Sequence, residues 1–269
     1  GALVAGVTVQ MSMALPRHAL QSTTMQAVTQ IRASDDYAPG VRDQQWRIGR
    51  SSLLASSLAL APYKDGFVTA RKEPGGAING TEQAPLLQAA VAVLSRGPVM
   101  FVDGVKYIDA SVLRKTCTKD GRLLQPSTTA IASDATYRDE VFGRVASSFP
   151  NQTEVWLAQS AVGPSLVYDI IFAADLQTEV VLSAPLCSRS SHLDGVVYRV
   201  DHASPNATLS LHPINCLTPL RLSPRPLPDF AIYIVAPVRH TPCTPGHHTA
   251  ARDTQRRHTE EQATRDGWI

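Results

Sequence analysis

Two adjacent residues, Asp35 and Asp36, carry groups suited to acid–base chemistry, and Arg32 supplies a permanent cation three positions earlier. They come at the end of a β-prone run, residues 27–33, which stops at the two adjacent carboxylates. A carboxyl group can donate or accept a proton in a reaction, and strand ends that carry acids are where α/β barrels place their chemistry. The segment Ser-Asp-Asp is also ordinary turn and helix-cap chemistry, which is the alternative interpretation.

Predicted strands and helices alternate four times in the first 120 residues. Strands are expected at 7–13, 27–33, 66–69 and 98–103, and helices at 19–25, 51–61, 82–96 and 110–117. This alternation is typical of a parallel α/β arrangement. From about residue 126 the chain changes to short strand-like runs separated by Gly and Pro, which favours an antiparallel β-sandwich. We therefore predict an α/β domain at 1–125, a β domain at 126–239, and a disordered or weakly ordered tail at 240–269.

Composition narrows the classes of partner and the compartment. The chain has 269 residues, 43% of them hydrophobic and 18% charged, which fits a protein with a buried core. A net charge of +2 argues against nucleic acid as a partner, and the apolar run at 1–15 is too short and too polar to span a membrane. Sequons at Asn79, Asn151 and Asn206 favour a secreted or endomembrane protein, with a cytoplasmic location as the alternative.

Four ordered motifs resemble the raffinose-synthase and alkaline α-galactosidase branch of glycoside hydrolase family 36. The segment Arg32-Ala-Ser-Asp-Asp-Tyr is the first, and Ala61-Pro-Tyr-Lys-Asp-Gly-Phe is the second, although the second lacks the family's usual Trp. The third runs from Leu87 to Asp103 and ends in Gly-Pro-Val-Met-Phe-Val-Asp, and the fourth comprises Val112-Leu-Arg-Lys and Asp120-Gly-Arg-Leu-Leu. The resemblance covers roughly residues 5–130 and does not cover the tail.

The resemblance implies strands five to eight of a (β/α)8 TIM barrel, followed by an antiparallel β domain. It also implies a retaining mechanism, in which two carboxyl groups about 5 Å apart act on opposite sides of the anomeric carbon. An Arg-x-x-x-Asp spacing selects Asp36 as the acid/base, with Arg32 binding the sugar, whereas alignment through Ser-Asp selects Asp35. The family's nucleophile lies in a Lys-x-Asp setting, and no such motif precedes residue 27. The chain is thus expected to be a C-terminal fragment that does not turn over glycosides alone.

Four further residues are candidates for contacts with substrate. Asp65 and Asp103 are expected at strand ends facing the same pocket, with surface turn acids as the alternative. Lys64 can donate to sugar hydroxyls, with a solvated lysine as the alternative. Trp46 can stack on a sugar ring, with packing of a loop tryptophan as the alternative.

The leading hypothesis is a fragment of a retaining glycoside hydrolase or transglycosylase that acts on α-galactosides or related oligosaccharides. The full-length parent would be the enzyme, the partner would be an oligosaccharide or glycoside, and no cofactor or metal is implied; the oligomeric state is left open. A second hypothesis is a non-catalytic carbohydrate-binding or scaffold protein. A third treats the region after residue 120 as an independent interaction module.

Overall fold

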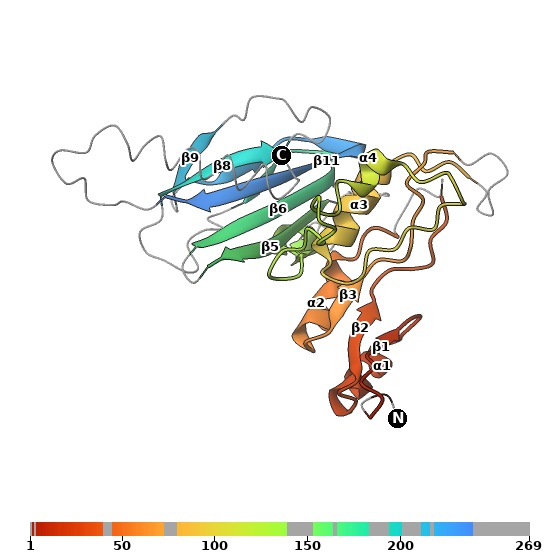
Figure 1. Ribbon diagram of the computed structural model, residues 1–269. Coiled ribbons are helices and arrows are strands. Elements are labelled where there is room, and N and C mark those ends of the chain that lie inside the picture. Colours follow the sequence, from red (N-terminus) through yellow and green to blue (C-terminus); the bar gives the residue numbers. More distant parts are fainter. Residues whose placement is uncertain are drawn as a thin grey trace.

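The computed structural model of the chain consists more of strands than of helices (Figure 1). It describes residues 2, 4–39, 45–72, 80–138, 153–163, 166–182, 194–200, 211–215 and 218–238. The sequons, Cys187, Cys216 and the predicted tail at 240–269 lie outside these residues. Across the described ranges, no helix is long and apolar enough to cross a membrane.

The largest element is a six-stranded antiparallel sheet with the order β4-β5-β6-β11-β8-β9. Its strands are β4 (Ile131–Ala132), β5 (Glu154–Val162), β6 (Leu166–Leu176), β8 (Asp194–Val200), β9 (His212–Asn215) and β11 (Arg225–Pro237). Successive side chains alternate between the two faces, so Trp156 and Phe172 join one core cluster while Val155 and Ile171 join another. Both faces of this sheet are therefore covered.

A two-stranded antiparallel sheet packs on the second face. It pairs β7 (Val180–Leu182) with β10 (Leu220–Leu222). Leu182 and Leu222 are buried in the cluster that contains Val155 and Ile171. This small sheet thus covers the side of the six-stranded sheet that faces away from α3.

Three short strands form a parallel sheet with the order β1-β2-β3. They are β1 (Val9–Met11), β2 (Val28–Arg32) and β3 (Ala61–Tyr63), and they alternate with α1 (Pro16–Gln21), the 3₁₀ helix η1 (Ser22–Thr24) and α2 (Gly49–Ser57). Residues near the predicted strands at 66–69 and 98–103 contribute one parallel bridge, Phe67 to Phe101. Because β2 and β3 are parallel neighbours, their carboxyl ends lie at the same edge.

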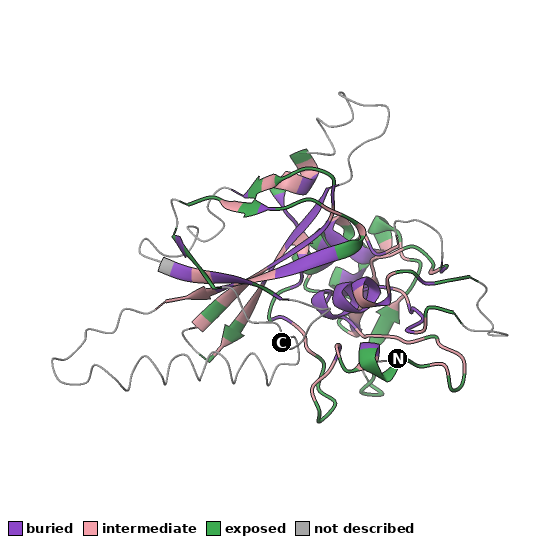
Figure 2. Cartoon of the chain, turned by 90° about the horizontal axis from the view of Figure 1, so that it is seen from above, coloured by how far each residue is buried: buried purple, intermediate pink, exposed green. Residues whose placement is uncertain are grey.

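Helix α3 (Pro85–Leu94) is buried along its length between the six-stranded sheet and the segments that follow β3 (Figure 2). Leu87 and Leu94 belong to the cluster with Trp156, whereas Ala89 packs in a cluster with Phe67. A helix that is apolar on all sides is typically enclosed on all sides. The short α4 (Ala110–Leu113) follows, capped by the Asp109 carboxylate, which accepts from the Ser111 backbone N–H.

The predicted fold class, the C-terminal half of a (β/α)8 barrel followed by a β-sandwich, is wrong. The structure is mostly β, its main sheet is antiparallel, and its helices are short. The apolar periodicity of residues 82–96 was interpreted as one face of an amphipathic helix on the outside of a barrel. In the fold, two sides of α3 are buried, and one of them packs on the antiparallel sheet.

The division at residue 125 stays a prediction. The cluster that contains Leu87 and Trp156 draws its residues from both sides of that position, and it also includes Trp46 and Phe230. Packing is therefore continuous between the first 125 residues and the antiparallel sheet.

Candidate functional site

Arg32, the last residue of β2, joins two carboxylates at the shared edge of β2 and β3. Its Nη2 lies 2.5 Å from Asp36 Oδ1 and its Nη1 lies 3.2 Å from Asp65 Oδ2. The Arg32 side chain is 10% exposed, whereas that of Asp36 is 72% exposed. Burial alone would lower the pKa of Arg32, but the hydrogen bond to Asp36 and the charges of the two carboxylates raise it. We call these three residues the Arg32 cluster.

Asp65 is fixed by hydrogen bonds from the backbone of two loops. Its Oδ2 accepts from the Tyr37 N–H at 2.9 Å and its Oδ1 accepts from the Gly66 N–H at 3.0 Å. The Asp65 N–H in turn donates to Ser34 Oγ at 2.8 Å. These bonds connect the loop after β2 to the loop after β3, so Asp65 positions the segment that carries Asp35 and Asp36.

Lys64 is buried behind the Arg32 cluster, with only 1% of its surface exposed. Its Nζ donates to the Asp65 carbonyl oxygen at 2.9 Å and lies 4.9 Å from the Tyr37 ring centre and 5.0 Å from that of Phe67. Burial lowers the pKa of Lys64 to about 7, against the opposing influence of the negative charges of Glu82 and Asp65. The alternative of a solvated lysine is therefore wrong, and the Nζ atom does not face solvent.

Glu82 is a buried carboxylate whose charge acts on Lys64. It accepts from the Tyr37 hydroxyl at 2.8 Å, the Ala84 N–H at 2.8 Å and Gln88 Nε2 at 3.3 Å. Burial, followed by the Glu82 charge and the hydrogen bond to it, raises the pKa of Tyr37 well above its ordinary value. Beneath the Arg32 cluster there is thus a buried group of charged and hydrogen-bonded side chains, formed by Lys64, Tyr37 and Glu82.

Asp103 is not part of the Arg32 cluster, and its hydrogen bonds stabilise local loop structure. Its Oδ1 accepts from the Thr69 N–H at 2.7 Å, the Thr69 hydroxyl at 2.7 Å and the Ala70 N–H at 3.0 Å. Its Oδ2 is buried, and no described residue bonds to it. Asp103 therefore holds the chain after Phe67 against the segment that precedes α4.

Trp46 is 4% exposed and belongs to the central core. Its ring centre lies 6.0 Å from that of Trp156 and 6.2 Å from that of Phe172, and the Arg47 guanidinium lies 4.6 Å from the same ring. The packing alternative is confirmed, because no face of this ring is available to stack on a sugar.

A second charged group joins the region of α2 to the six-stranded sheet. Glu154 Oε1 lies 3.3 Å from Arg47 Nη1 and 3.5 Å from Arg50 Nη1, and its Oε2 accepts from Trp156 Nε1 at 2.6 Å. Arg47 also pairs with Asp175. Burial raises the pKa of Glu154, although the Trp156 hydrogen bond and the two arginines oppose this effect. The group has the arrangement of a structural ion-pair network.

The structure brings together three of the predicted site residues, Arg32, Asp36 and Asp65, with Lys64 directly behind them. Asp35 is exposed on the same loop, whereas Asp103 and Trp46 belong to other groups. Sequence analysis missed Tyr37 and Glu82. Tyr37 directly follows the Asp pair, but Glu82 was interpreted only as the start of a helix, and nothing in the sequence indicates that it contacts Tyr37.

The described residues contain no group of three or more side chains with the geometry of a metal site. No model of a known protein family matches the sequence, and no curated protein matches it either.

Proposed function

We propose that the Arg32 cluster binds a glycoside and contributes the acid/base of a retaining glycoside hydrolase or transglycosylase that acts on α-galactosides or related oligosaccharides. The observation that carries this proposal is the contact of one guanidinium with Asp36 and Asp65 at the edge of two adjacent parallel strands. Carboxylates accept, and guanidinium groups donate, hydrogen bonds of the kind that sugar hydroxyls make. The proposal rests on this cluster and on the motif resemblance, and it does not require a barrel.

The exposure of the acids supports different roles for them. Asp36 is 72% exposed and can reach a ligand without rearrangement of the core, whereas Asp65 accepts hydrogen bonds at both carboxylate oxygens. Asp36 is therefore the better candidate for proton transfer, with Asp35 as the alternative, and Asp65 is a positioning residue. Retention needs a second carboxylate as nucleophile, and the proposal assigns that role to no residue of this chain.

The second candidate is a non-catalytic carbohydrate-binding protein. It is favoured by the engagement of Asp65 and Asp103 in backbone hydrogen bonds, which leaves neither of them well placed to attack an anomeric carbon. The two candidates share the binding step and differ in chemistry, so one experiment addresses binding and another addresses turnover.

Binding is tested by calorimetric titration of the purified chain with methyl α-galactoside. Asp36→Asn and Arg32→Met are expected to weaken binding about tenfold, because each removes a charged hydrogen-bonding partner. Asp134→Asn removes an exposed acid elsewhere and should leave binding unchanged. Absence of saturable binding to the wild-type chain, or equal binding by all variants, contradicts the proposal.

Turnover is tested with an aryl α-galactoside and the same purified chain. No hydrolysis is expected, because the chain is proposed to supply only one of the two acids. Hydrolysis would contradict the assignment of the acid/base without the nucleophile. In an active longer form, separate Asp36→Asn and Asp35→Asn variants would identify the acid/base by the larger loss of rate, and an unchanged rate in both would eliminate both.

A further inference from the structure

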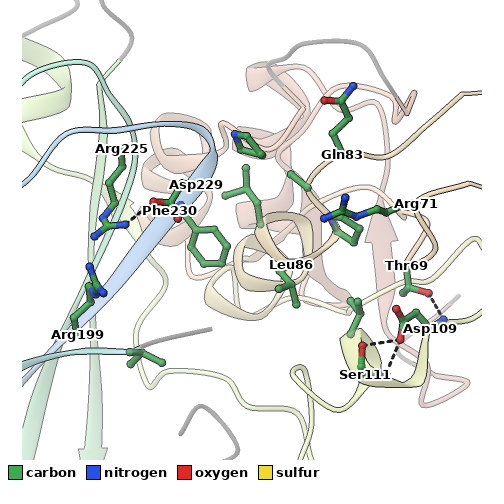
Figure 3. Close-up of a pocket in the computed structure, with 16 residues that line it drawn as sticks. Thr69, Arg71, Gln83, Leu86, Asp109, Ser111, Arg199, Arg225, Asp229 and Phe230 are labelled. Carbon is green, nitrogen blue, oxygen red and sulfur yellow. Dashed lines mark hydrogen bonds and ion pairs between the residues drawn. The ribbon is translucent and has the colours of Figure 1, made fainter. Parts of the chain in front are cut away.

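A cavity separates the α3–α4 region from strands β8 and β11 (Figure 3). Its volume is about 560 Å³, which lies in the size range of small-ligand sites. None of the residues of the Arg32 cluster lines it. The cavity is thus distinct from the candidate site at the Arg32 cluster.

One part of the cavity wall is apolar. Leu86 of α3 and Phe230 of β11 point toward each other across it in Figure 3, and Val112 of α4 also lines it. Val112 and Phe230 are 4% and 8% exposed, so they form a packed surface. An apolar ring or short hydrocarbon chain can bury its surface here.

Arginines stand on two sides of this apolar part. Arg71 lies on the side of Thr69 and Asp109, whereas Arg199 and Arg225 lie on the side of the sheet (Figure 3). Arg71 and Arg199 are exposed, and in the described part of the chain neither is paired with a carboxylate. Two cations that pair with no carboxylate among the described residues therefore face a cavity with an apolar wall.

The two acids that line the cavity are already engaged. Asp229 pairs with Arg225 at 2.5 Å and accepts from the Phe230 N–H at 2.9 Å. Asp109 accepts from the Ser111 hydroxyl at 2.7 Å and the Ser111 N–H at 2.8 Å, and these bonds lower the pKa of Asp109. Asp109 is ionised as the α4 cap, so the lining carries three arginines against two carboxylates and its net charge is positive.

We propose that this cavity binds a small organic anion, with its carboxylate or phosphate group at Arg71 or at Arg199 and its ring or chain against the apolar wall between them, which includes Leu86, Val112 and Phe230. A guanidinium presents paired N–H donors that match the oxygens of either anion. The proposal is independent of glycoside binding at the Arg32 cluster.

The chemistry is tested by titrating the purified chain with phenyl phosphate, benzoate, phenol and inorganic phosphate, followed by calorimetry or by shifts of backbone NMR signals. At least one of the two aromatic anions is expected to bind saturably, more tightly than phenol and inorganic phosphate, and more weakly at high salt. Preference for phenyl phosphate or for benzoate identifies the anionic group. Equal binding of phenol, or equal binding of inorganic phosphate, overturns the proposal, as does the absence of saturable binding by both aromatic anions.

Location is tested with Arg71→Gln and Arg199→Gln. The variant that removes the arginine in contact with the anion is expected to weaken binding of the preferred anion about tenfold, as loss of a charge-assisted hydrogen bond would, and the other variant is expected to weaken it less. Arg114→Gln removes an exposed arginine that does not line the cavity and is the matched control. Because Arg71 and Arg199 are both exposed, the variants should fold, which thermal melts would verify. Unchanged binding in both variants, or equal loss in the control, rejects this site.

Discussion

Replacing Lys64 by Met should make the protein more stable at neutral pH and should remove one component of its pH dependence. The folded state holds the Lys64 amine with a pKa of about 7, against an ordinary value of 10.5, because burial disfavours its charge. At pH values below 7 both folded and unfolded states carry the proton. Over that range burial of the charge costs the folded state about 5 kcal/mol relative to a neutral amine, from about 1.4 kcal/mol per pKa unit.

The sign of the pH dependence follows from the bound protons. Between pH 7 and 10.5 the unfolded chain keeps a proton that the folded chain has released, so the free energy of unfolding rises with pH. Above 10.5 both states are neutral and the cost disappears. Met removes the titration, and it also removes the hydrogen bond from Lys64 Nζ to the Asp65 carbonyl, which is worth about 1 kcal/mol. Lys64→Met is therefore expected to be more stable by about 4 kcal/mol below pH 7 and to lose this advantage toward pH 10.

The assay is urea unfolding followed by tryptophan fluorescence, with wild type and Lys64→Met compared at matched pH from about 6 to 10. Other titrating groups contribute to both proteins, so the difference between the two curves isolates Lys64. Lys119→Met, at an exposed position, should show a small difference that does not vary with pH. A difference for Lys64→Met that is equally independent of pH would refute the argument that burial lowers this pKa.

Three further substitutions test other parts of the structure by chemical denaturation. Arg32→Met should lower the free energy of unfolding by about 2 kcal/mol, because it leaves two carboxylates without their shared cation. Gly49→Ala should cost about 2 kcal/mol and shift the fluorescence maximum, since a Cβ at this position would lie 2.4 Å from Trp156 Nε1. Asp175→Asn should cost about 3 kcal/mol, because it removes the charge of one partner of the buried Arg47 guanidinium.

Two of these substitutions have a control in the same region, and the third is compared with wild type. Asp36→Asn breaks an exposed ion pair and should cost less than about 1 kcal/mol, so a loss as large as that of Arg32→Met would contradict the first argument. Ser56→Ala, at an exposed position of α2, should be nearly neutral; Gly49→Ala as mild as this would contradict the steric argument. Equal stability of Asp175→Asn and wild type would show that the Arg47 network contributes little.

Local pattern was sufficient to locate several elements. Strand β2 and helix α3 lie within three residues of the predicted ranges and helix α2 within four, because short-range periodicity and prolines such as Pro85, the first residue of α3, determine where such elements begin and end. The Arg-x-x-x-Asp motif of the resemblance also placed Arg32 and Asp36 at one predicted site, and their side chains are in contact. The way in which these elements pack against one another was predicted wrongly. The antiparallel sheet that covers one side of α3 comes from residues more than 35 positions away, and nothing in α3 itself identifies that partner.

The candidate site likewise has one part that the sequence predicted and another that it did not. Asp65 was expected near Asp36 because both follow strands of one parallel sheet, and Arg32 does contact both. Burial of Lys64 was not foreseen, because the rings and the carboxylate that enclose it come from Tyr37, Phe67 and Glu82, three separated segments. A lysine in a polar sequence is ordinarily exposed, so its environment follows only from the tertiary contacts.

The enclosure of Lys64 has a consequence for chemical labelling of the protein. Acylating reagents attack an unprotonated amine, and a pKa of about 7 leaves much of the Lys64 amine in that form at neutral pH. The same side chain is 1% exposed beneath Tyr37 and Phe67. Its acylation must therefore wait until these rings separate from it, so at high reagent concentration the labelling rate measures how often this region opens.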